Sequence, residues 1–372
     1  MSTIAWTEDH TPRTAHWHSE NGAPAPRTVT VADDTLAADQ AYRRIRAGES
    51  LLWNGDFHNG RQLLTALGRR ADRAAKRPPT GDLTARYEHE RDRKRTRAGI
   101  LGRLLVVLDD NDLHLRRAPE VRAACLAAYG PNPGARVVAF SELLGVLGAY
   151  RWQQQGVEVP ALGARIHPGY GVFSPTRSEY VDLVADAPLN PAARTAFDLG
   201  TGTGVLAVVL ARRGISRVTA TDINPRALRC ASENIERLGY ADRIEVTGPA
   251  LYPSGRADLV VCNPPWLPGE PTSDLERGVY DRDQSMLTEF AHGLRAHLTP
   301  SGEGWLVLSD LAELLGLRPA GALPALFGEA GLEVLARLTT RPRHPRAGDR
   351  DDPLAAARTA ETTSLWRLRA RA

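Results

Sequence analysis

The sequence predicts an α/β protein of two domains: a mainly helical N-terminal domain, residues 1–160, and a doubly wound, seven-stranded domain, residues 161–372. Three observations support this fold class. The chain has 372 residues, more than the roughly 250–300 that one hydrophobic core usually serves. Its 42% hydrophobic and 24% charged residues are typical of globular proteins. From about residue 195 onward, short apolar strands alternate with amphipathic helices, as in a parallel sheet covered by helices.

The apolar residues of the N-terminal domain mostly follow helical spacing. Residues 1–33 are rich in Pro, Thr, Ser and His without a sustained period, which predicts a loose or late-docking terminus. Residues 101–108 form an apolar run that indicates a buried strand or helix. Helices are expected at 35–47, around 63–67, at 119–129 and at 141–155. Gly, Pro and small residues then cluster over 156–163 and place the domain boundary there.

A turn rich in Gly and Asn separates the first two of these helices. Its segment, residues 51–61, carries two aromatic side chains, Trp53 and Phe57, and one histidine. Such punctuation indicates a tight turn that packs both aromatic rings inward. The alternative is that the segment forms part of a substrate-binding wall.

One segment is strongly basic although the chain as a whole is not. The chain has 47 Lys and Arg residues against 44 Asp and Glu residues, a net charge of +3 that is too small for the whole molecule to bind polyanions. Residues 69–103, however, hold twelve Lys or Arg against five Asp or Glu. This segment is either a solvated helix face or mobile loop, or a patch that contacts phosphates.

Cysteine usage and hydropathy predict a cytoplasmic protein without a metal site. The three cysteines, Cys125, Cys230 and Cys262, lie far apart and fit no zinc-ligand spacing. Cys262 belongs to an apolar run and is expected to be an inert core thiol. Residues 1–20 lack the apolar run of a signal peptide, and no stretch reaches the ~18 apolar residues of a membrane span. We therefore expect no membrane partner and no bound metal.

Seven strands are expected in the C-terminal domain, with helices between them. The strands lie at 195–199, 217–221, 243–246, 257–262, 304–309, 332–340 and 362–369. The helices lie at 202–213, 225–238, 284–298, 311–317 and 322–330. The last two strands follow one another directly, so the sheet is expected to end in a hairpin.

A glycine-rich turn joins the first of these strands to its helix and predicts a ligand site. Glycine allows a positive φ and a close approach of the ligand, and the following helix presents free N–H groups. The residues expected to bind a cofactor here are Asp198, Gly200, Thr201, Gly202 and Gly204. Asp222 ends the next strand, where its carboxylate can accept both hydroxyls of a ribose. Val205 stands where a nicotinamide fingerprint has its third glycine, so a different nucleoside cofactor is expected.

The loop after the fourth strand carries Asn263-Pro264-Pro265-Trp266, at the sheet edge where ligands of such folds bind. With the glycine-rich turn, this loop makes residues 169–369 resemble the class I S-adenosylmethionine-dependent methyltransferases. Within them it resembles the amino-methyltransferases with an Asn-Pro-Pro-aromatic motif, which include release-factor glutamine, adenine-N6 and ribosomal guanine-N2 methyltransferases. The resemblance implies a Rossmann-like fold, S-adenosyl-L-methionine as cofactor and a nitrogen atom as methyl acceptor.

The residue types of this loop suit the methylation of a planar nitrogen. The lone pair of such a nitrogen is delocalised, so its hydrogens must be held until the lone pair faces the methyl group. The Asn263 side-chain carbonyl, which is also expected to contact the cofactor, and the Pro264 backbone carbonyl can each accept one N–H. Pro265 and Trp266 would bind the acceptor, with the indole as a stacking surface. Asn263, Pro264 and Trp266 are the predicted catalytic residues.

The resemblance also assigns a covering segment upstream of the first strand. Phe173 and Pro175 would lie over the cofactor and the acceptor, and Thr176 or Glu179 would make polar contacts with them. The alternative for this segment is a simple connector between the domains.

Walls for the two ligands complete the predicted site. Ile223 and Leu251 are expected to flank the adenine, and Tyr280 to form a wall for the acceptor. Ala250 stands where related methyltransferases often have a carboxylate that binds the adenine amino group. Adenine binding is therefore expected to rely on backbone groups and apolar packing.

The methyl acceptor is left open by the sequence. A nucleobase amine in RNA or DNA, or a protein side-chain amide, is placed first, with the N-terminal domain as recognition domain. A small planar metabolite of a biosynthetic pathway is the second alternative. A catalytically silent nucleoside-binding protein is the third, which the intact Asn263-Pro264 pair disfavours.

Overall fold

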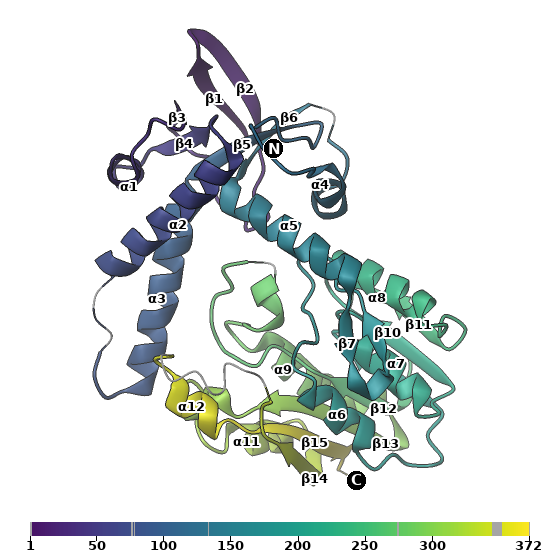
Figure 1. The fold of residues 1–372 in the computed structure, drawn as a ribbon. Coiled ribbons are helices and arrows are strands. Elements are labelled where there is room, and N and C mark those ends of the chain that lie inside the picture. The colour runs from purple at the N-terminus through teal and green to yellow at the C-terminus, as the bar shows by residue number, and fades with distance from the viewer. Residues whose placement is uncertain are drawn as a thin grey trace. The chain divides into compact units, whose positions relative to one another are not determined.

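The structure is a computed structural model that describes residues 2–75, 77, 79–132, 134–273, 275–343 and 352–371. The chain divides into two compact units, drawn together in Figure 1. The first unit comprises Met1–Thr80 and Glu88–Arg151, and the second comprises Gly81–Tyr87 and Trp152–Ala372. The expected boundary at residue 160 thus lies inside the second unit, and each unit is described by itself.

A six-stranded mixed sheet lies at the centre of the first unit. Its strands are β1 (Thr3–Glu8), β2 (Thr11–Trp17), β3 (Val29–Ala32), β4 (Ser50–Trp53), β5 (Leu104–Asp109) and β6 (Ala135–Ala139). Their order is β1-β2-β6-β5-β4-β3, in which β3, β4 and β5 are parallel and β6 is antiparallel to β5. The helices are α1 (Ala38–Arg46), α2 (Phe57–Ala74), α3 (Leu83–Leu101), α4 (Arg122–Tyr129) and α5 (Phe140–Gln155).

This sheet corrects the prediction for the start of the chain. Residues 1–33 were expected to be a loose terminus, which is wrong, because β1 and β2 form an antiparallel hairpin and β3 follows it. Helices cover more residues than strands in this unit, as predicted, but the six-stranded sheet at its centre was not expected. The missing signal has a physical reason: Ala15 is the one buried residue of β2, so hardly any apolar alternation marks that strand.

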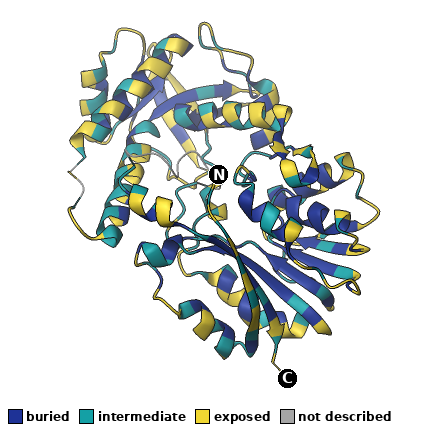
Figure 2. Cartoon of the chain, turned by 60° about the horizontal axis from the view of Figure 1, so that its bottom comes forward, coloured by how far each residue is buried: buried dark blue, intermediate teal, exposed yellow. Residues whose placement is uncertain are grey.

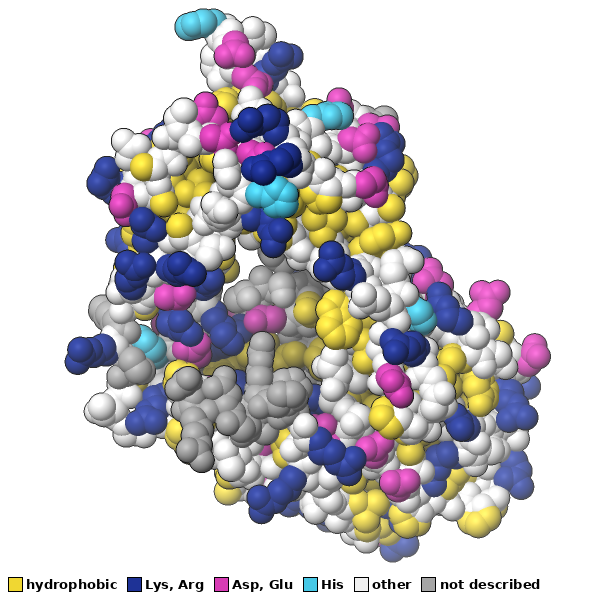
Figure 3. All heavy atoms as spheres, in the orientation of Figure 1, with side chains coloured by type: hydrophobic (Ala, Val, Ile, Leu, Met, Phe, Trp, Pro, Cys, Tyr) yellow, Lys and Arg dark blue, Asp and Glu magenta, His cyan; other side chains and the backbone are white. Residues whose placement is uncertain are grey.

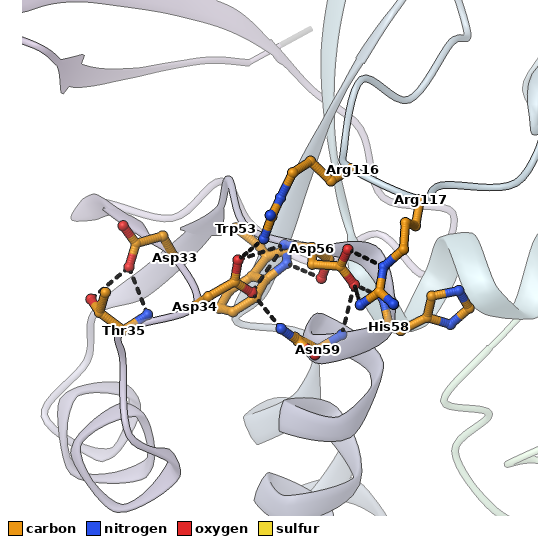
Figure 4. A network of polar contacts seen from close by, with 9 residues as sticks. All are labelled: Asp33, Asp34, Thr35, Trp53, Asp56, His58, Asn59, Arg116 and Arg117. Carbon is orange, nitrogen blue, oxygen red and sulfur yellow. Dashed lines mark hydrogen bonds and ion pairs between the residues drawn. The ribbon is translucent and has the colours of Figure 1, made fainter.

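The carboxyl ends of β3 and β4 are closed by polar contacts within the first unit (Figure 4). Asp56 caps α2, because its side chain accepts hydrogen bonds from the backbone N–H groups of His58 at 2.9 Å and Asn59 at 3.4 Å. Arg117 donates two further bonds to the same carboxylate, at 2.6 and 2.8 Å. Asp34 accepts a bond from Arg116 at 2.5 Å. Both carboxylates are therefore paired with cations of the same unit.

The turn between β4 and α2 packs its aromatic rings inward, as predicted. Trp53 and Phe57 are 3% exposed each, and the indole N–H of Trp53 donates to the backbone carbonyl of Asp56 at 3.0 Å. A Cβ added to Gly60 would lie 2.5 Å from the Phe140 ring, so the helix approaches its neighbours closely at that glycine. The tight-turn interpretation is confirmed.

A seven-stranded sheet forms the second unit, and all seven predicted strands are present. They are β9 (Thr195–Leu199), β10 (Arg217–Thr221), β11 (Ile244–Thr247), β12 (Ala257–Cys262), β13 (Leu298–Ser309), β14 (Leu332–Thr340) and β15 (Thr363–Ala370). Their order is β11-β10-β9-β12-β13-β15-β14, and β15 runs antiparallel to both of its neighbours. The chain order reverses beside β9, which is where doubly wound sheets bind their ligands.

Shorter elements complete the second unit. Its helices are α6 (Glu179–Asp186), α7 (Val205–Arg212), α8 (Pro225–Arg237), α9 (Ser285–His297), α10 (Leu311–Leu314), α11 (Ala322–Glu329) and α12 (Ala355–Ala360). The single-turn helices are η1 (Pro160–Leu162) and η2 (Leu275–Gly278), and the small hairpin consists of β7 (Val157–Val159) and β8 (Ala164–Ile166).

Successive side chains of the strands fill two separate cores, one on each face of the sheet. Ala196 packs with residues of α6, α7 and α8, whereas its neighbour Phe197 packs with residues of α9 and α11. Figure 2 shows the strands of this sheet buried along most of their length, with exposed residues on the covering helices. In the described part of the chain, no helix combines the length and apolar character of a membrane span.

Candidate active site

A cavity of about 600 Å³ opens at the carboxyl edge of β9, β10 and β12 in the second unit. Most of the predicted site residues lie in its wall. They are Phe173, Asp198, Gly200, Thr201, Gly202, Asp222, Ile223, Asn263, Pro265 and Tyr280. The described lining does not include Pro175, Gly204, Pro264 or Trp266.

The glycine-rich turn between β9 and α7 uses its glycines for two different purposes. Gly200 has a φ of +68°, and an added Cβ would lie 2.3 Å from the terminal methyl of Met286, so a side chain there would close this part of the cavity. Gly204, with a φ of +82°, instead lets α7 approach Ala231 of α8, where an added Cβ would lie 3.3 Å away. Gly204 therefore allows α7 and α8 to pack closely, and it is not among the described residues that line the cavity.

Asp198 holds the turn from beneath. The side chain is 1% exposed, and its Oδ2 accepts hydrogen bonds from the Thr201 hydroxyl at 2.6 Å and from the Ala207 backbone N–H at 3.0 Å. Burial raises the pKa of this carboxyl to about 6, against the effect of the two donors. Asp198 thus fixes the backbone of the turn while it also lines the cavity.

Asp222 lies at the end of β10 and connects the two βα turns. Its Oδ2 accepts a hydrogen bond from the Gly202 backbone N–H at 3.0 Å, and its Oδ1 accepts one from the Asn224 N–H at 2.8 Å. Burial raises the pKa of the Asp222 carboxyl, while these N–H groups favour its charged form. Each oxygen has a further lone pair that can accept a ligand hydroxyl.

The predicted adenine walls stand beside Asp222. Ile223 is 73% exposed at the cavity, an unusual position for a large apolar side chain, whereas Leu251 lines the same cavity and is buried. The backbone N–H of Ala250 donates to the backbone carbonyl of Asp222 at 3.3 Å. The stretch that lacks a carboxylate is thus joined to β10 through its backbone.

The Asn263-Pro264-Pro265-Trp266 loop places only part of its motif in the cavity. Asn263 and Pro265 line it. The indole N–H of Trp266 donates to Oδ1 of Asn263 at 2.8 Å, and the Arg177 guanidinium lies over the indole ring at 4.6 Å from its centroid. Trp266 is therefore turned toward Asn263 and Arg177, and it does not present the expected stacking surface in the cavity wall.

The segment upstream of β9 contributes one predicted residue and one that sequence reasoning missed. Phe173 lines the cavity and packs against Gly278, where an added Cβ would lie 2.7 Å from the Cβ of Phe173. Tyr180, from the first turn of α6, also lines the cavity and had no local motif to mark it. Glu179 is 1% exposed, accepts a bond from Arg177 at 2.6 Å and is not among the described residues that line the cavity.

A loop between Leu267 and Asp281 closes one side of the cavity. Its two ends are joined, since the N–H of Leu267 donates to the Val279 carbonyl and the N–H of Asp281 donates to the Leu267 carbonyl, both at 3.0 Å. Arg277 and Tyr280 come from this loop and line the cavity. Arg277, like Met286 and Glu289 of α9, was missed by the sequence analysis because only the fold brings these residues to the glycine-rich turn.

Known protein families match this part of the chain. Residues 164–330 match the family model described as the methyltransferase small domain. The matched residues include the glycine-rich turn, Asp222 and the loop of Asn263. Residues 164–330 thus form a methyltransferase domain. Class I methyltransferases use S-adenosylmethionine, so the matches confirm the predicted fold of the C-terminal domain, its resemblance to this family and the cofactor that the family uses.

Curated relatives of this methyltransferase domain act on different molecules. A release factor glutamine methyltransferase of Cereibacter sphaeroides is 34% identical over 44% of this chain and 66% of its own length. A tRNA1(Val) (adenine(37)-N6)-methyltransferase of Shewanella loihica is 28% identical over 45% of this chain and 71% of its own. A ribosomal protein L11 methyltransferase of Pelotomaculum thermopropionicum is 52% identical over 18% of this chain and 23% of its own. The matches thus span less than half of this chain.

A solved structure is also similar to part of this chain. The ribosomal protein L11 methylase of Lactobacillus delbrueckii subsp. bulgaricus has 18% sequence identity and a TM-score of 0.38, over 56% of this chain and 86% of its own. A likeness of this size carries no argument about the acceptor.

None of the three cysteines is among the described residues that line the cavity. Cys125, Cys230 and Cys262 are free and buried. Burial raises the pKa of Cys262 well above its usual value, which agrees with an inert core thiol. Among the residues that the structure describes, no group of three or more His, Cys, Asp or Glu is placed to hold a metal ion.

Several arginines of the basic segment 69–103 form ion pairs with acidic residues of the same chain. In the first unit, Arg93 and Arg97 both bind Asp72, at 3.1 and 2.8 Å, which joins α3 to α2. Arg95 pairs with Asp92 of its own helix at 2.7 Å. On the face shown in Figure 3, Lys and Arg side chains are interspersed with Asp and Glu. Lys76 lies outside the described residues. These pairs favour the solvated helix face over a phosphate-binding patch.

Proposed function

We propose that this protein transfers a methyl group from S-adenosylmethionine to a planar amino or amide nitrogen. The observation that carries the proposal is that Asn263 lines the same cavity as Asp222 and the glycine-rich turn. A hydrogen-bond acceptor for the incoming nitrogen thus stands beside the groups suited to the nucleoside part of the donor. Curated relatives named for glutamine and adenine-N6 methylation support nitrogen as the acceptor atom.

The proposed binding mode assigns a task to each part of the cavity. The Asp222 carboxylate accepts the ribose hydroxyls, and Ile223 and Leu251 flank the adenine. The Gly200 turn leaves room for the rest of the donor, since any side chain there would meet Met286. The lining groups that remain, Phe173, Tyr180, Tyr280 and Pro265, surround the space for the acceptor.

In the proposed reaction, the protein acts mainly by positioning. The Asn263 side-chain carbonyl and the Pro264 backbone carbonyl accept the N–H groups of the acceptor. Bound S-adenosylmethionine would supply an electrophilic sulfonium methyl, which the lone pair of the acceptor nitrogen would attack. The carbon–sulfur bond would break with its electron pair passing to sulfur, giving the neutral thioether S-adenosylhomocysteine. The methylated nitrogen loses one proton to solvent, which balances the charge.

A macromolecular acceptor is our first choice, and a small planar metabolite is the alternative. The relatives named above act on a release factor, a tRNA and a ribosomal protein, all of them macromolecules. The ion pairs of Arg93, Arg95 and Arg97 give no support to a nucleic acid over a protein. Lysate of cells that lack this protein, incubated with it and labelled S-adenosylmethionine, will identify the acceptor by which fraction takes up label: RNA, DNA, protein or small molecules.

The substitution Asn263→Ala tests the proposed reaction. We expect kcat to fall by about a hundredfold or more, because the side chain acts on the reacting nitrogen, while cofactor affinity stays within about twofold. Asn190→Ala is the matched control, since Asn190 is exposed outside the cavity and its amide oxygen accepts only the Ala192 N–H at 3.0 Å in the described structure. Turnover of Asn263→Ala within a few-fold of wild type would contradict the nitrogen-transfer mechanism. If both variants bind cofactor but no fraction takes up label with wild type, the silent-binder alternative gains support.

A further inference from the structure

The indole of Trp266 is bonded to the side chain that the proposed function depends on. Its N–H donates to Oδ1 of Asn263 at 2.8 Å, and Trp266 lies outside the described cavity lining to which Asn263 belongs. Given the proposed function, we infer that Trp266 is a positioning residue that fixes the orientation of the Asn263 amide. Its N–H, and not its flat face, is the part that the reaction needs.

The inference follows from the symmetry of an amide side chain. The oxygen and the NH2 group of asparagine are nearly equal in shape, but the oxygen accepts hydrogen bonds and the NH2 group donates them. An indole N–H can only donate, so it selects the orientation in which Oδ1 faces Trp266. Oδ1 retains a second lone pair for an acceptor N–H. With the amide turned over, an N–H of the acceptor would meet the NH2 group, and two donors cannot bond.

Trp266 is itself held by a buried ion-pair network of the second unit. The Arg177 guanidinium lies over the indole at 4.6 Å and binds Glu179 at 2.6 Å and Glu361 at 3.0 Å. Both glutamates are at most 3% exposed. Glu361 also accepts a bond from the Ser309 hydroxyl, at the end of β13, at 2.6 Å. The indole therefore rests on a cation whose position is fixed from two sides.

The other contacts of the indole fit the same role. The Tyr180 ring meets it edge to face with the centroids 6.5 Å apart, and Tyr180 is fully enclosed at 3% exposure. Trp266 also packs against apolar cores on both faces of the sheet. Such packing keeps the N–H aimed at Asn263, and it leaves one indole face covered by the Arg177 guanidinium. A planar acceptor could stack there only after this cation had moved.

The substitution Trp266→Phe separates the N–H from the flat ring. We expect kcat to fall about tenfold, the size of effect that one neutral hydrogen bond can have, with acceptor KM and cofactor affinity within about twofold. A stacking role predicts the opposite, because phenylalanine keeps an aromatic face: nearly normal kcat. Trp17→Phe is the matched control in the first unit, where the Trp17 indole N–H donates to the Ala23 carbonyl at 2.7 Å, and its kcat should not change.

A second variant guards against a packing defect in Trp266→Phe. Site-specific replacement of Trp266 by 3-benzothienylalanine exchanges the N–H for sulfur and keeps the size of the ring system. The same tenfold loss of kcat is expected, with an unchanged melting temperature. Wild-type kcat in this variant would overturn the inference, whatever the phenylalanine variant does.

A double substitution distinguishes failure of the inference from failure of the proposed function. Trp266→Phe should cost nothing further in the Asn263→Ala background, because the N–H then has no amide to orient. An additional tenfold loss there would assign Trp266 a separate role and overturn the inference. High turnover of Asn263→Ala alone would instead contradict the proposed function. Turnover is measured as label transferred to the fraction that the lysate experiment identifies.

Discussion

Parallel strands end in acidic residues in both units, yet the two sheet edges differ in what the acids bind. In the first unit, Arg116 and Arg117 pair with Asp34 and Asp56, which follow β3 and β4 (Figure 4). In the second unit, no ion pair joins a described cation to Asp198 or Asp222, although both follow or end parallel strands. An acidic residue at the end of a strand is therefore a candidate for ligand binding where no described Lys or Arg of the same unit is paired with it, as with Asp198 and Asp222.

The pKa directions express the same difference. Hydrogen bonds from Arg117 lower the pKa of Asp56 to about 2, whereas burial raises the pKa of Asp198 to about 6. Burial therefore destabilises the charged forms of Asp198 and Asp222, and no paired cation among the described residues offsets this effect. Such groups are candidates for function, because a ligand can satisfy them.

Among the substitutions that test this comparison, Asp222→Ala should have the largest effect, a loss of affinity for S-adenosylmethionine. We expect S-adenosylmethionine to bind about 10–100-fold more weakly, since hydrogen bonds to a charged acceptor contribute about 1.5–3 kcal/mol. Asp34→Ala, at the corresponding edge of the first unit, should leave cofactor affinity unchanged. Titration calorimetry measures both. Equal affinity of Asp222→Ala and wild type, or a preference of wild type for a nicotinamide dinucleotide, would contradict the cofactor site.

Glu142 extends the comparison to an unpaired acid inside the first unit. It is 9% exposed and accepts bonds from the Glu20 N–H at 3.1 Å and the Tyr129 hydroxyl at 3.2 Å. Burial raises its pKa from 4.5 to about 7. The folded state therefore favours the protonated form, and this contribution to stability is lost as the pH rises from about 4.5 through 7.

Glu142→Gln tests this assignment, because glutamine stays neutral and still offers an oxygen acceptor. The variant should be more stable than wild type by about 1–3 kcal/mol at pH 8, with the difference vanishing toward pH 4. Urea unfolding at several pH values measures it. A variant that is less stable than wild type at pH 8 would mean that Glu142 is ionised and bound to a cation in the folded protein.

Asp56→Asn should show the smallest effect, with the opposite dependence on pH. The pKa of Asp56 is lowered from 3.8 to about 2, so its carboxylate stabilises the fold above about pH 4, and this contribution is lost as the pH falls toward 2. Arg117 is 65% exposed, and solvent therefore screens the pair. At pH 7, the urea concentration at the unfolding midpoint should be lower for the variant than for wild type. Near pH 2, the two midpoints should be equal. An equal difference at both pH values would assign the effect to capping alone.

The second unit could be predicted closely because most of its strands are marked in their own segments. Five of its strands have at least three buried residues, for example β12 with the burial of Leu259–Cys262. In the first unit, the hairpin of β1 and β2 buries only Ile4, Trp6 and Ala15, so no apolar run marks it. The strands β4 and β6 are mostly buried, but they are only four and five residues long, too short for apolar patterning alone to distinguish a strand from a buried helical segment.

For the site, the sequence could predict which residues meet but not which way they turn. Asn263, Asp222 and the glycine-rich turn are brought together by the order of the strands, which the alternation of strands and helices implied. The orientation of Trp266 depends on Arg177, and that of Arg177 on Glu361, which lies 184 residues farther along the chain. No local motif carries such a dependence.

The place of β15 in the sheet has a consequence for how the protein is made. β15 is inserted between β13 and β14, although both of those strands leave the ribosome before it does. Until residues 363–370 emerge, β14 has no strand to pair with, and Glu361 cannot yet fix Arg177 beneath Trp266. A nascent chain therefore holds the complete glycine-rich turn and Asp222 well before Asn263 has its support. On the proposed mechanism, methyl transfer therefore requires synthesis of the chain through β15.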